Sequence, residues 1–112
     1  DAFTIAEFVM GVNETTEADL PETVLAWDLV RAVNMARWAF ICGYINEDEM
    51  WEAIRTTAGI AKESFNSWEE YGNSFAVGRG IWRGETDDYE TADEVVGALL
   101  NKEDSPWKAI EW

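Results

Sequence analysis

Length and charge set the first limits on this protein. The chain has 112 residues, 47% of them hydrophobic, and its 23 acidic and 8 basic residues give a formal net charge of −15. A chain of this length buries one core, so we expect a single domain over residues 1–112. The negative charge argues against nucleic acid and anionic membranes as partners, because phosphate groups attract clustered Lys and Arg.

Membrane insertion and disulfide bonding are also disfavoured. No uninterrupted apolar run approaches the roughly 18 residues of a membrane span. Cys42 is the only cysteine, which excludes an internal disulfide. Its neighbours Phe40, Ile41 and Tyr44 predict a buried, inert thiol. We therefore expect a cytoplasmic protein.

The first half of the chain predicts two helices joined by an acidic connection. Residues 1–12 predict a short helix, and Pro21 helps to end the connection that follows. Residues 22–42 predict a long helix with apolar side chains in nearly every direction, which is typical of a buried, central helix. Gly43 is placed to end it in a left-handed conformation.

The second half predicts three further helices. Asn46 is the expected cap of one, and Ser67 with Glu70 has the spacing of a capping box that starts the next. Gly72, Gly78 and Gly80 lie within that helix, where each costs about 1 kcal/mol relative to Ala, so we expect another backbone to approach closely there.

Residues 85–94 contain six acids and no base, and we expect the first part to be an exposed loop. Thr91 and Glu94 repeat the capping-box spacing before a short last helix. Pro106 prevents helix at Ser105, and the tail is expected to dock through Trp107, Ile110 and Trp112. The predicted fold is all-α: a compact bundle of about five helices around the helix at 22–42.

The sequence offers little catalytic or cofactor chemistry. It has no histidine and one cysteine, so common hydrolytic triads and thiolate zinc clusters are excluded. Asp87, Asp88 and Glu90 lack the register of a calcium-binding loop. We therefore predict no catalytic residue, no metal and no cofactor. A sugar or small-molecule site built from Trp and a carboxylate pair remains an alternative, which would be hydrolytic if the pair flanked the bond.

Charged residues within apolar segments predict an internal polar network. Asp28 and Arg31 are three residues apart on one helical face and can pair, whereas Arg37 points the other way. Arg79, between two glycines, is expected to join them. Burial of an unpaired charge costs several kcal/mol, so pairing is expected if these residues are internal. An arginine-lined ligand site is the alternative interpretation.

The acidic segment supplies a candidate interaction surface. Its members are Glu85, Asp87, Asp88, Glu90, Asp93 and Glu94. A strongly acidic face raises the encounter rate with a basic partner, although acidic residues can also serve solubility alone.

Three segments together resemble domain-of-unknown-function family 1266. They are "AWDLVRAVNMARWAFICGYIN", "SWEEYGNSFAVGRGIW" and "SPWKAIEW", in the same order over residues 26–112. The resemblance implies an α-helical fold and a bacterial origin, and it carries no assigned activity. The residues before Ala26 are outside the quoted motifs and are expected to be particular to this protein.

We interpret the protein as a non-catalytic, acidic protein-binding module, with an immunity-type inhibitor of a basic toxin as its narrower form. The alternatives are the small-molecule or carbohydrate site and a structural subunit that self-associates through its Trp residues. The sequence does not choose an oligomeric state.

Overall fold

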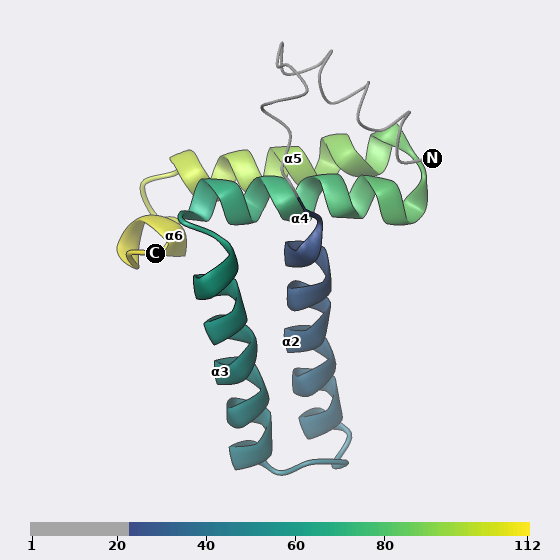
Figure 1. Ribbon diagram of the computed structural model, residues 1–112, viewed down its shortest axis with the longest axis vertical. Coiled ribbons are helices and arrows are strands. Elements are labelled where there is room, and N and C mark those ends of the chain that lie inside the picture. Colours follow the sequence, from purple (N-terminus) through teal and green to yellow (C-terminus); the bar gives the residue numbers. More distant parts are fainter. Residues whose placement is uncertain (1–22) are drawn as a thin grey trace.

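The computed structural model describes residues 23–112, and every regular element in that range is a helix (Figure 1). The elements are α2 (Leu25–Ile41), α3 (Glu47–Ser64), α4 (Trp68–Arg83), α5 (Thr86–Asn101) and the short α6 (Pro106–Ala109). The predicted all-α class is confirmed. The helix expected over residues 1–12 lies outside the described residues.

The four long helices form two antiparallel pairs that lie crosswise. α2 and α3 make a hairpin, and α4 and α5 lie side by side across the open end of that hairpin (Figure 1). α6 and the C-terminus lie where α4 begins, next to the last turn of α3. The far half of the hairpin therefore extends away from the α4–α5 pair.

Two groups of buried apolar side chains form the core. The group between α4 and α5 consists of Ala76, Val77, Tyr89, Ala92 and Val96. The group that joins the hairpin consists of Ala26, Leu29, Ala61 and Phe65. Phe75 of α4 packs against both groups, so α4 connects the two halves of the core.

Helix α2 is the helix predicted over residues 22–42, but its expected burial is wrong. Only Ala26, Leu29 and Ala36 of α2 are buried. The apolar residues do surround the helix, whereas in the described part of the chain α3 and α4 cover only one side of it. α4 is the central helix, and its buried residues are Gly72, Ser74, Ala76, Val77, Gly78 and Gly80.

Small residues explain why α4 lies in the middle. A Cβ atom on Gly78 would lie 2.4 Å from the Cβ of Trp27 on α2. A Cβ atom on Gly72 would lie 2.6 Å from Cγ1 of Val96 on α5. Close approach at these glycines was predicted, but the neighbours are side chains and not backbone.

Two helices begin at the predicted caps. Asn46 Oδ1 accepts a hydrogen bond from the Glu49 N–H at 2.8 Å, and Glu49 Oε1 accepts one from the Asn46 N–H at 3.1 Å. This capping box starts α3. Ser67 Oγ accepts from the Glu70 N–H at 3.1 Å at the start of α4, but the Glu70 carboxylate accepts from the Asn66 N–H at 2.7 Å. In a capping box the Glu70 carboxylate would accept from the N–H of the cap residue Ser67, but here it accepts from the residue before it.

The first turn of α2 is capped by another helix. Its own N-cap residue is Val24, which has no side-chain acceptor. The Ser74 hydroxyl on α4 accepts a hydrogen bond from the Ala26 N–H at 3.2 Å and donates one to the Thr23 carbonyl at 2.7 Å. Ser74 is fully buried, so the bonds form away from water. α4 thus determines where α2 begins.

The acidic segment expected to begin as a loop is helical. Gly84 adopts a left-handed conformation (φ 73°), and α5 begins two residues later at Thr86. Asp87 and Asp88 lie in the first turn, where carboxylates interact favourably with the positive end of the helix dipole. Thr91, the expected cap, lies inside the helix and donates its hydroxyl to the Asp87 carbonyl at 3.0 Å.

The C-terminal tail docks through Trp107 and Trp112, as predicted, but the expected docking of Ile110 is wrong, because this residue is 60% exposed. Trp107 stacks on Trp68 with ring centroids 4.9 Å apart, and Trp112 meets Trp68 edge-on at 5.0 Å. The Trp68 indole N–H donates to the Ile110 carbonyl at 2.7 Å, and the Trp112 N–H donates to the Phe65 carbonyl at 2.8 Å. These contacts join the tail to the end of α3 and the start of α4.

Candidate functional site

An indole pair marks the place where α2 crosses α4. Trp27 of α2 and Trp82 of α4 have ring centroids 5.6 Å apart and an angle of 44° between ring planes. The Phe75 ring of α4 also contacts Trp27, with ring centroids 5.5 Å apart and an angle of 43° between ring planes. Because Gly78 has no side chain, the Cβ of Trp27 occupies the space beside it, and the two helices lie close together.

Two guanidinium groups lie over both indole rings. Arg31 Cζ is 5.7 Å from the Trp27 centroid and 5.3 Å from the Trp82 centroid. Arg79 Cζ is 5.4 Å and 5.6 Å from the same two centroids. Each helix therefore contributes one ring and one cation. We name Trp27, Arg31, Arg79 and Trp82 the Trp–Arg cluster; each such contact contributes about 0.5–1 kcal/mol at an exposed site.

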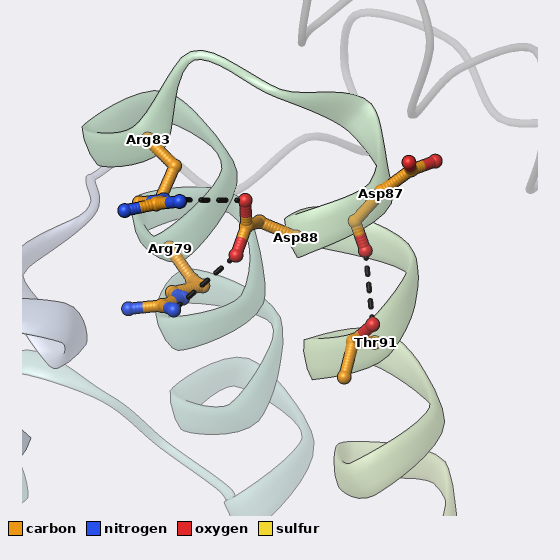
Figure 2. A network of polar contacts seen from close by, with 5 residues as sticks. All are labelled: Arg79, Arg83, Asp87, Asp88 and Thr91. Atoms are coloured by element: carbon orange, nitrogen blue, oxygen red, sulfur yellow. Dashed lines mark hydrogen bonds and ion pairs between the residues drawn. The ribbon is translucent and has the colours of Figure 1, made fainter.

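Asp88 joins the cluster from α5 (Figure 2). Its Oδ1 atom lies 3.2 Å from Arg79 Nη2, and its Oδ2 atom lies 3.4 Å from Arg83 Nε. The Asp88 side chain is 19% exposed. Asp87, the preceding residue, points away from both arginines (Figure 2). One carboxylate thus holds two guanidinium groups and fixes α5 to α4.

The predicted polar network of Asp28, Arg31, Arg37 and Arg79 does not form. Asp28, Arg31 and Arg37 are exposed, and neither ion pair of residues 23–112 includes any of them. Charges that stay in water need no partner, so the argument for obligatory pairing does not apply to them. Arg79 has a carboxylate partner, but this partner is Asp88, which the sequence placed on the acidic surface.

Helix geometry divides the six acids of the predicted interaction surface. Glu85, Asp87, Glu90 and Glu94 are exposed, Asp93 is partly exposed, and Asp88 turns toward α4. Asp87, Glu90 and Glu94 are spaced by three and four residues, so they share one face of α5. We name these three residues the α5 acidic face.

A hollow of about 290 Å³ adjoins the Trp–Arg cluster. Its lining consists of Trp27, Phe75, Arg79, Asp88, Thr91, Ala92 and Val95. Its one carboxylate, Asp88, is already paired with two arginines. Glycoside hydrolysis by the usual routes needs two carboxylates on either side of the scissile bond, and this hollow does not supply them.

The cluster is held by ring contacts instead of indole hydrogen bonds. Trp27 Nε1 is buried and has no hydrogen-bond partner among the described residues. An unpaired buried donor costs about 1–3 kcal/mol. The contacts of the Trp27 ring with Phe75, Trp82 and the two guanidinium groups offset that cost.

An exposed apolar stripe continues along α2 from the cluster. Met35, Trp38 and Ile41 are 62%, 61% and 75% exposed. Cys42 is exposed as well, so the prediction of a buried thiol is wrong. Arg31, Met35, Trp38 and Cys42 are spaced by four, three and four residues, which aligns them on one helix face. We name Met35, Trp38, Ile41 and Cys42 the α2 stripe.

Sequence reasoning missed the stripe and found only parts of the cluster. Apolar residues all round a helix predict burial all round, and this concealed the open face of α2. The pairs Trp27–Arg31 and Arg79–Trp82 have helical spacings of four and three, and both could be found in the sequence. That the two pairs meet depends on the crossing of α2 and α4, which no single-helix pattern contains.

The described residues offer neither a metal site nor a membrane span. In residues 23–112, no three His, Cys, Asp or Glu side chains are grouped so that they could hold a metal ion. The helices of the same range lack the combination of length and apolarity needed to cross a bilayer. The cluster and the stripe present ring faces, guanidinium groups and apolar side chains, which are the groups of a contact surface.

Comparison with known proteins identifies a family. A family model described as a protein of unknown function (DUF1266) matches residues 4–112. The match begins well before Ala26, so the expectation that the first residues are particular to this chain is wrong. No curated protein and no solved structure matches the chain. The chain therefore belongs to the DUF1266 family.

Proposed function

We propose that this protein is a non-catalytic binding module that holds a basic protein partner against the α2 stripe. The observation that carries the proposal is the exposure of Met35, Trp38 and Ile41 on one open helix face. Large apolar side chains gathered on an exposed surface are typical of protein–protein contact sites. Aromatic residues and Met are enriched at the centres of such interfaces, where they are taken out of water on binding.

The charges beside the stripe indicate the sign of the partner. Asp28 is exposed in the first turn of α2, on the N-terminal side of the stripe. The first turn of α3, which follows the C-terminal end of the stripe in the chain, exposes Glu47, Asp48 and Glu49. Arg31 and Arg37 of α2 are exposed as well, so four carboxylates outnumber two guanidinium groups around the stripe. This excess of carboxylates complements an apolar patch bordered by Lys and Arg. The net charge of −15 has the same sign, so it favours approach of a basic partner over an acidic one.

The α5 acidic face has a different part in the proposal. Asp87, Glu90 and Glu94 lie on another helix and are exposed without an ion pair among the described residues. They add to the field that accelerates the encounter, while the α2 stripe makes the contact. Because charges in water are screened beyond about 8 Å at physiological salt, this contribution is sensitive to ionic strength.

An immunity-type inhibitor of a basic toxin is the narrower form of the proposal. A nuclease toxin carries a basic surface for its substrate, and a carboxylate-rich partner with an apolar centre suits such a surface. The absence of histidine from the sequence supports a binding role over a catalytic one. Bacterial origin and cytoplasmic location stay predictions.

Affinity capture from the native host tests the proposal. The full chain is immobilised and compared with a Met35→Gln/Trp38→Gln variant, which removes the centre of the stripe. A matched control is Ile60→Gln/Val95→Gln, because Ile60 and Val95 are also exposed, at 42% and 52%, but lie on α3 and α5. We expect one basic protein to be retained by the parent and the control, to be lost from the stripe variant, and to be released as salt is raised.

Three outcomes contradict the proposal. The first is retention of acidic proteins only, or of no protein at low salt. The second is equal retention by the parent and the stripe variant. The third is a dimer of the pure protein, seen as doubled mass in solution and abolished in the stripe variant, because the stripe would then be covered by a second copy.

A further inference from the structure

A second hollow of about 290 Å³ lies between α2, α3, the start of α4 and the C-terminal tail. It shares no lining residue with the Trp–Arg cluster or the α2 stripe. We name it the C-terminal groove. Its lining includes Ile54, Ala58, Lys62, Trp68, Tyr71 and Trp112. The groove is a separate feature, and the inference drawn from it does not rest on the proposed protein-binding function.

The aromatic walls of the groove are held in place from outside it. Trp68 and Trp112 meet at 77° with ring centroids 5.0 Å apart, and Tyr71 lies 5.5 Å from Trp112. The two indole N–H groups donate to the carbonyls of Ile110 and Phe65. The walls are therefore formed before any ligand arrives, which lowers the entropy cost of binding.

The same hydrogen bonds decide which ligand fits. Because both indole N–H groups already have acceptors, the rings offer their faces and C–H edges to the groove. The Thr57 hydroxyl is also used, since it donates to the Ala53 carbonyl of its own helix at 2.8 Å. Lys62 Nζ lies over the Trp112 ring, 5.2 Å from its centroid. The lining groups that stay available are the Tyr71 hydroxyl and the charged ends of the exposed Lys62 and Glu111. A polar ligand that lies against the two indole rings would leave most of its donors and acceptors without partners, whereas an apolar ligand would lose none.

The volume sets the size of the ligand. At roughly 30 Å³ for each water-sized group, about 290 Å³ holds on the order of ten such groups, which corresponds to a bicyclic aromatic molecule. An apolar cavity of about half that volume is sufficient to bind benzene. The walls, the hydrogen-bonded indole N–H groups and the volume all suit a flat apolar molecule that lies against Trp68 and Trp112.

We propose that the C-terminal groove is a binding site for a small, apolar, bicyclic aromatic ligand, and that it discriminates against polar molecules of the same shape. Indole and purine are suitable probes, because both are flat bicycles of similar size and only purine carries several ring nitrogens that require hydrogen bonds. The site discriminates because its two indole N–H groups are already hydrogen-bonded, so the tryptophan walls offer only ring faces and C–H edges.

Titration of the full, nitrogen-15-labelled chain tests this inference by NMR. We expect indole to shift the side-chain resonances of Trp68 and Trp112 saturably, with a Kd at or below about 1 mM, which is the range open to ligands of about ten heavy atoms. Purine should bind at least about tenfold more weakly, because its unpaired nitrogens must be desolvated.

A variant in which a larger side chain fills the groove provides a second test. Ala58→Phe places a ring in the groove, and Ala53→Phe is the matched control, because both alanines are exposed residues of α3 and Ala53 does not line the groove. Ala58→Phe should weaken indole at least about tenfold, and Ala53→Phe should leave its affinity within about twofold of the parent value. Ala58→Leu replaces Ala58→Phe if the larger side chain prevents folding, as judged by thermal melting.

Several results would overturn the inference: no saturable shift with indole, equal affinity for purine, or unchanged affinity in the Ala58 variants. A shift of the Trp68 and Trp112 resonances on dilution without ligand would also overturn it, since a second copy of the chain would then occupy the groove. Failure of the partner-capture experiment leaves these outcomes unaffected, because the two surfaces share no residue.

Discussion

Gly78 of α4 lies against Trp27 of α2 so closely that a single Cβ atom would come within 2.4 Å of the Trp27 Cβ. This contact sets the distance between the two halves of the molecule, because α4 belongs to one helix pair and α2 to the other. The three contacts of the Trp–Arg cluster that join α2 to α4 depend on it: Trp27 with Trp82, Arg31 with Trp82, and Arg79 with Trp27. The close approach that glycine permits is thus the basis of the candidate site.

Replacing Gly78 by Ala should therefore destabilise the protein, although Ala is the better helix former. We expect a loss of about 2 kcal/mol or more, since the clash involves backbone-proximal atoms that cannot rotate away. Gly59→Ala is the control: Gly59 is exposed in α3 and nothing lies within 4 Å of its Cβ position, so that variant should gain up to about 1 kcal/mol. Thermal and urea denaturation measure both. Equal effects of the two substitutions would contradict the account of the helix crossing.

Asp88 should contribute more to stability than its neighbour Asp87. Both lie in the first turn of α5, so both lose the helix-dipole interaction on conversion to Asn. Only Asp88→Asn also loses the ion pairs to Arg79 and Arg83. Because these groups are partly exposed, we expect an additional loss of only about 1 kcal/mol, which falls as salt is raised. Denaturant titrations at low and high salt check this, and an equal loss in the two variants would argue against the pairing.

Arg31 and Arg37 should behave differently, because only Arg31 lies over indole rings. Arg31→Met should lower the free energy of unfolding by about 1–2 kcal/mol, because two cation–π contacts are lost. Arg37→Met should change it by less than about 0.5 kcal/mol, since Arg37 is exposed and outside both ion pairs of the described residues. A large loss in both variants, measured by thermal melting, would instead favour the internal polar network that the sequence predicted.

Tyr71 should make the protein sensitive to alkaline pH. Burial raises the pKa of the Tyr71 hydroxyl above its ordinary value of 10.0, because the charged form is disfavoured away from water. The neutral Tyr71 hydroxyl therefore has its full stabilising effect below pH 10, the ordinary pKa. This effect is lost as the pH rises through the folded-state pKa, by at most about 1.4 kcal/mol per pH unit. Tyr71→Phe should remove this loss. Tyr44→Phe should retain it, because Tyr44 is 85% exposed; urea titrations between neutral and alkaline pH compare the variants.

Local signals in the sequence predicted local structure well. Asn46 and Ser67 cap the helices that they were expected to cap, Gly43 has φ 83°, and the tail docks through Trp107 and Trp112. These features depend on a few neighbouring residues or on large apolar groups that must be buried somewhere. Their physical causes are contained in short segments of the chain.

The arrangement of the helices was harder to predict. The apolar residues all round α2 indicated a central helix, whereas the glycines and alanines of α4 give that helix the central position. The acids before Thr91 indicated a loop, because their charge was taken as a sign of exposure and not as a favourable interaction with a helix terminus. Of the proposed network, only Arg79 has an ion pair within residues 23–112. Its partner Asp88 comes from a helix whose position relative to α4 no single segment determines.

The most direct test of the proposed function is the affinity of the captured basic partner for the parent chain and for Met35→Gln/Trp38→Gln. Central aromatic residues of an interface commonly contribute 2 kcal/mol or more each, so we expect the double substitution to raise Kd at least about a hundredfold. The free energy of unfolding should change by no more than about 1 kcal/mol, because both side chains are already in water. An unchanged Kd, or a variant that no longer folds, would contradict the assignment of the α2 stripe as a binding surface.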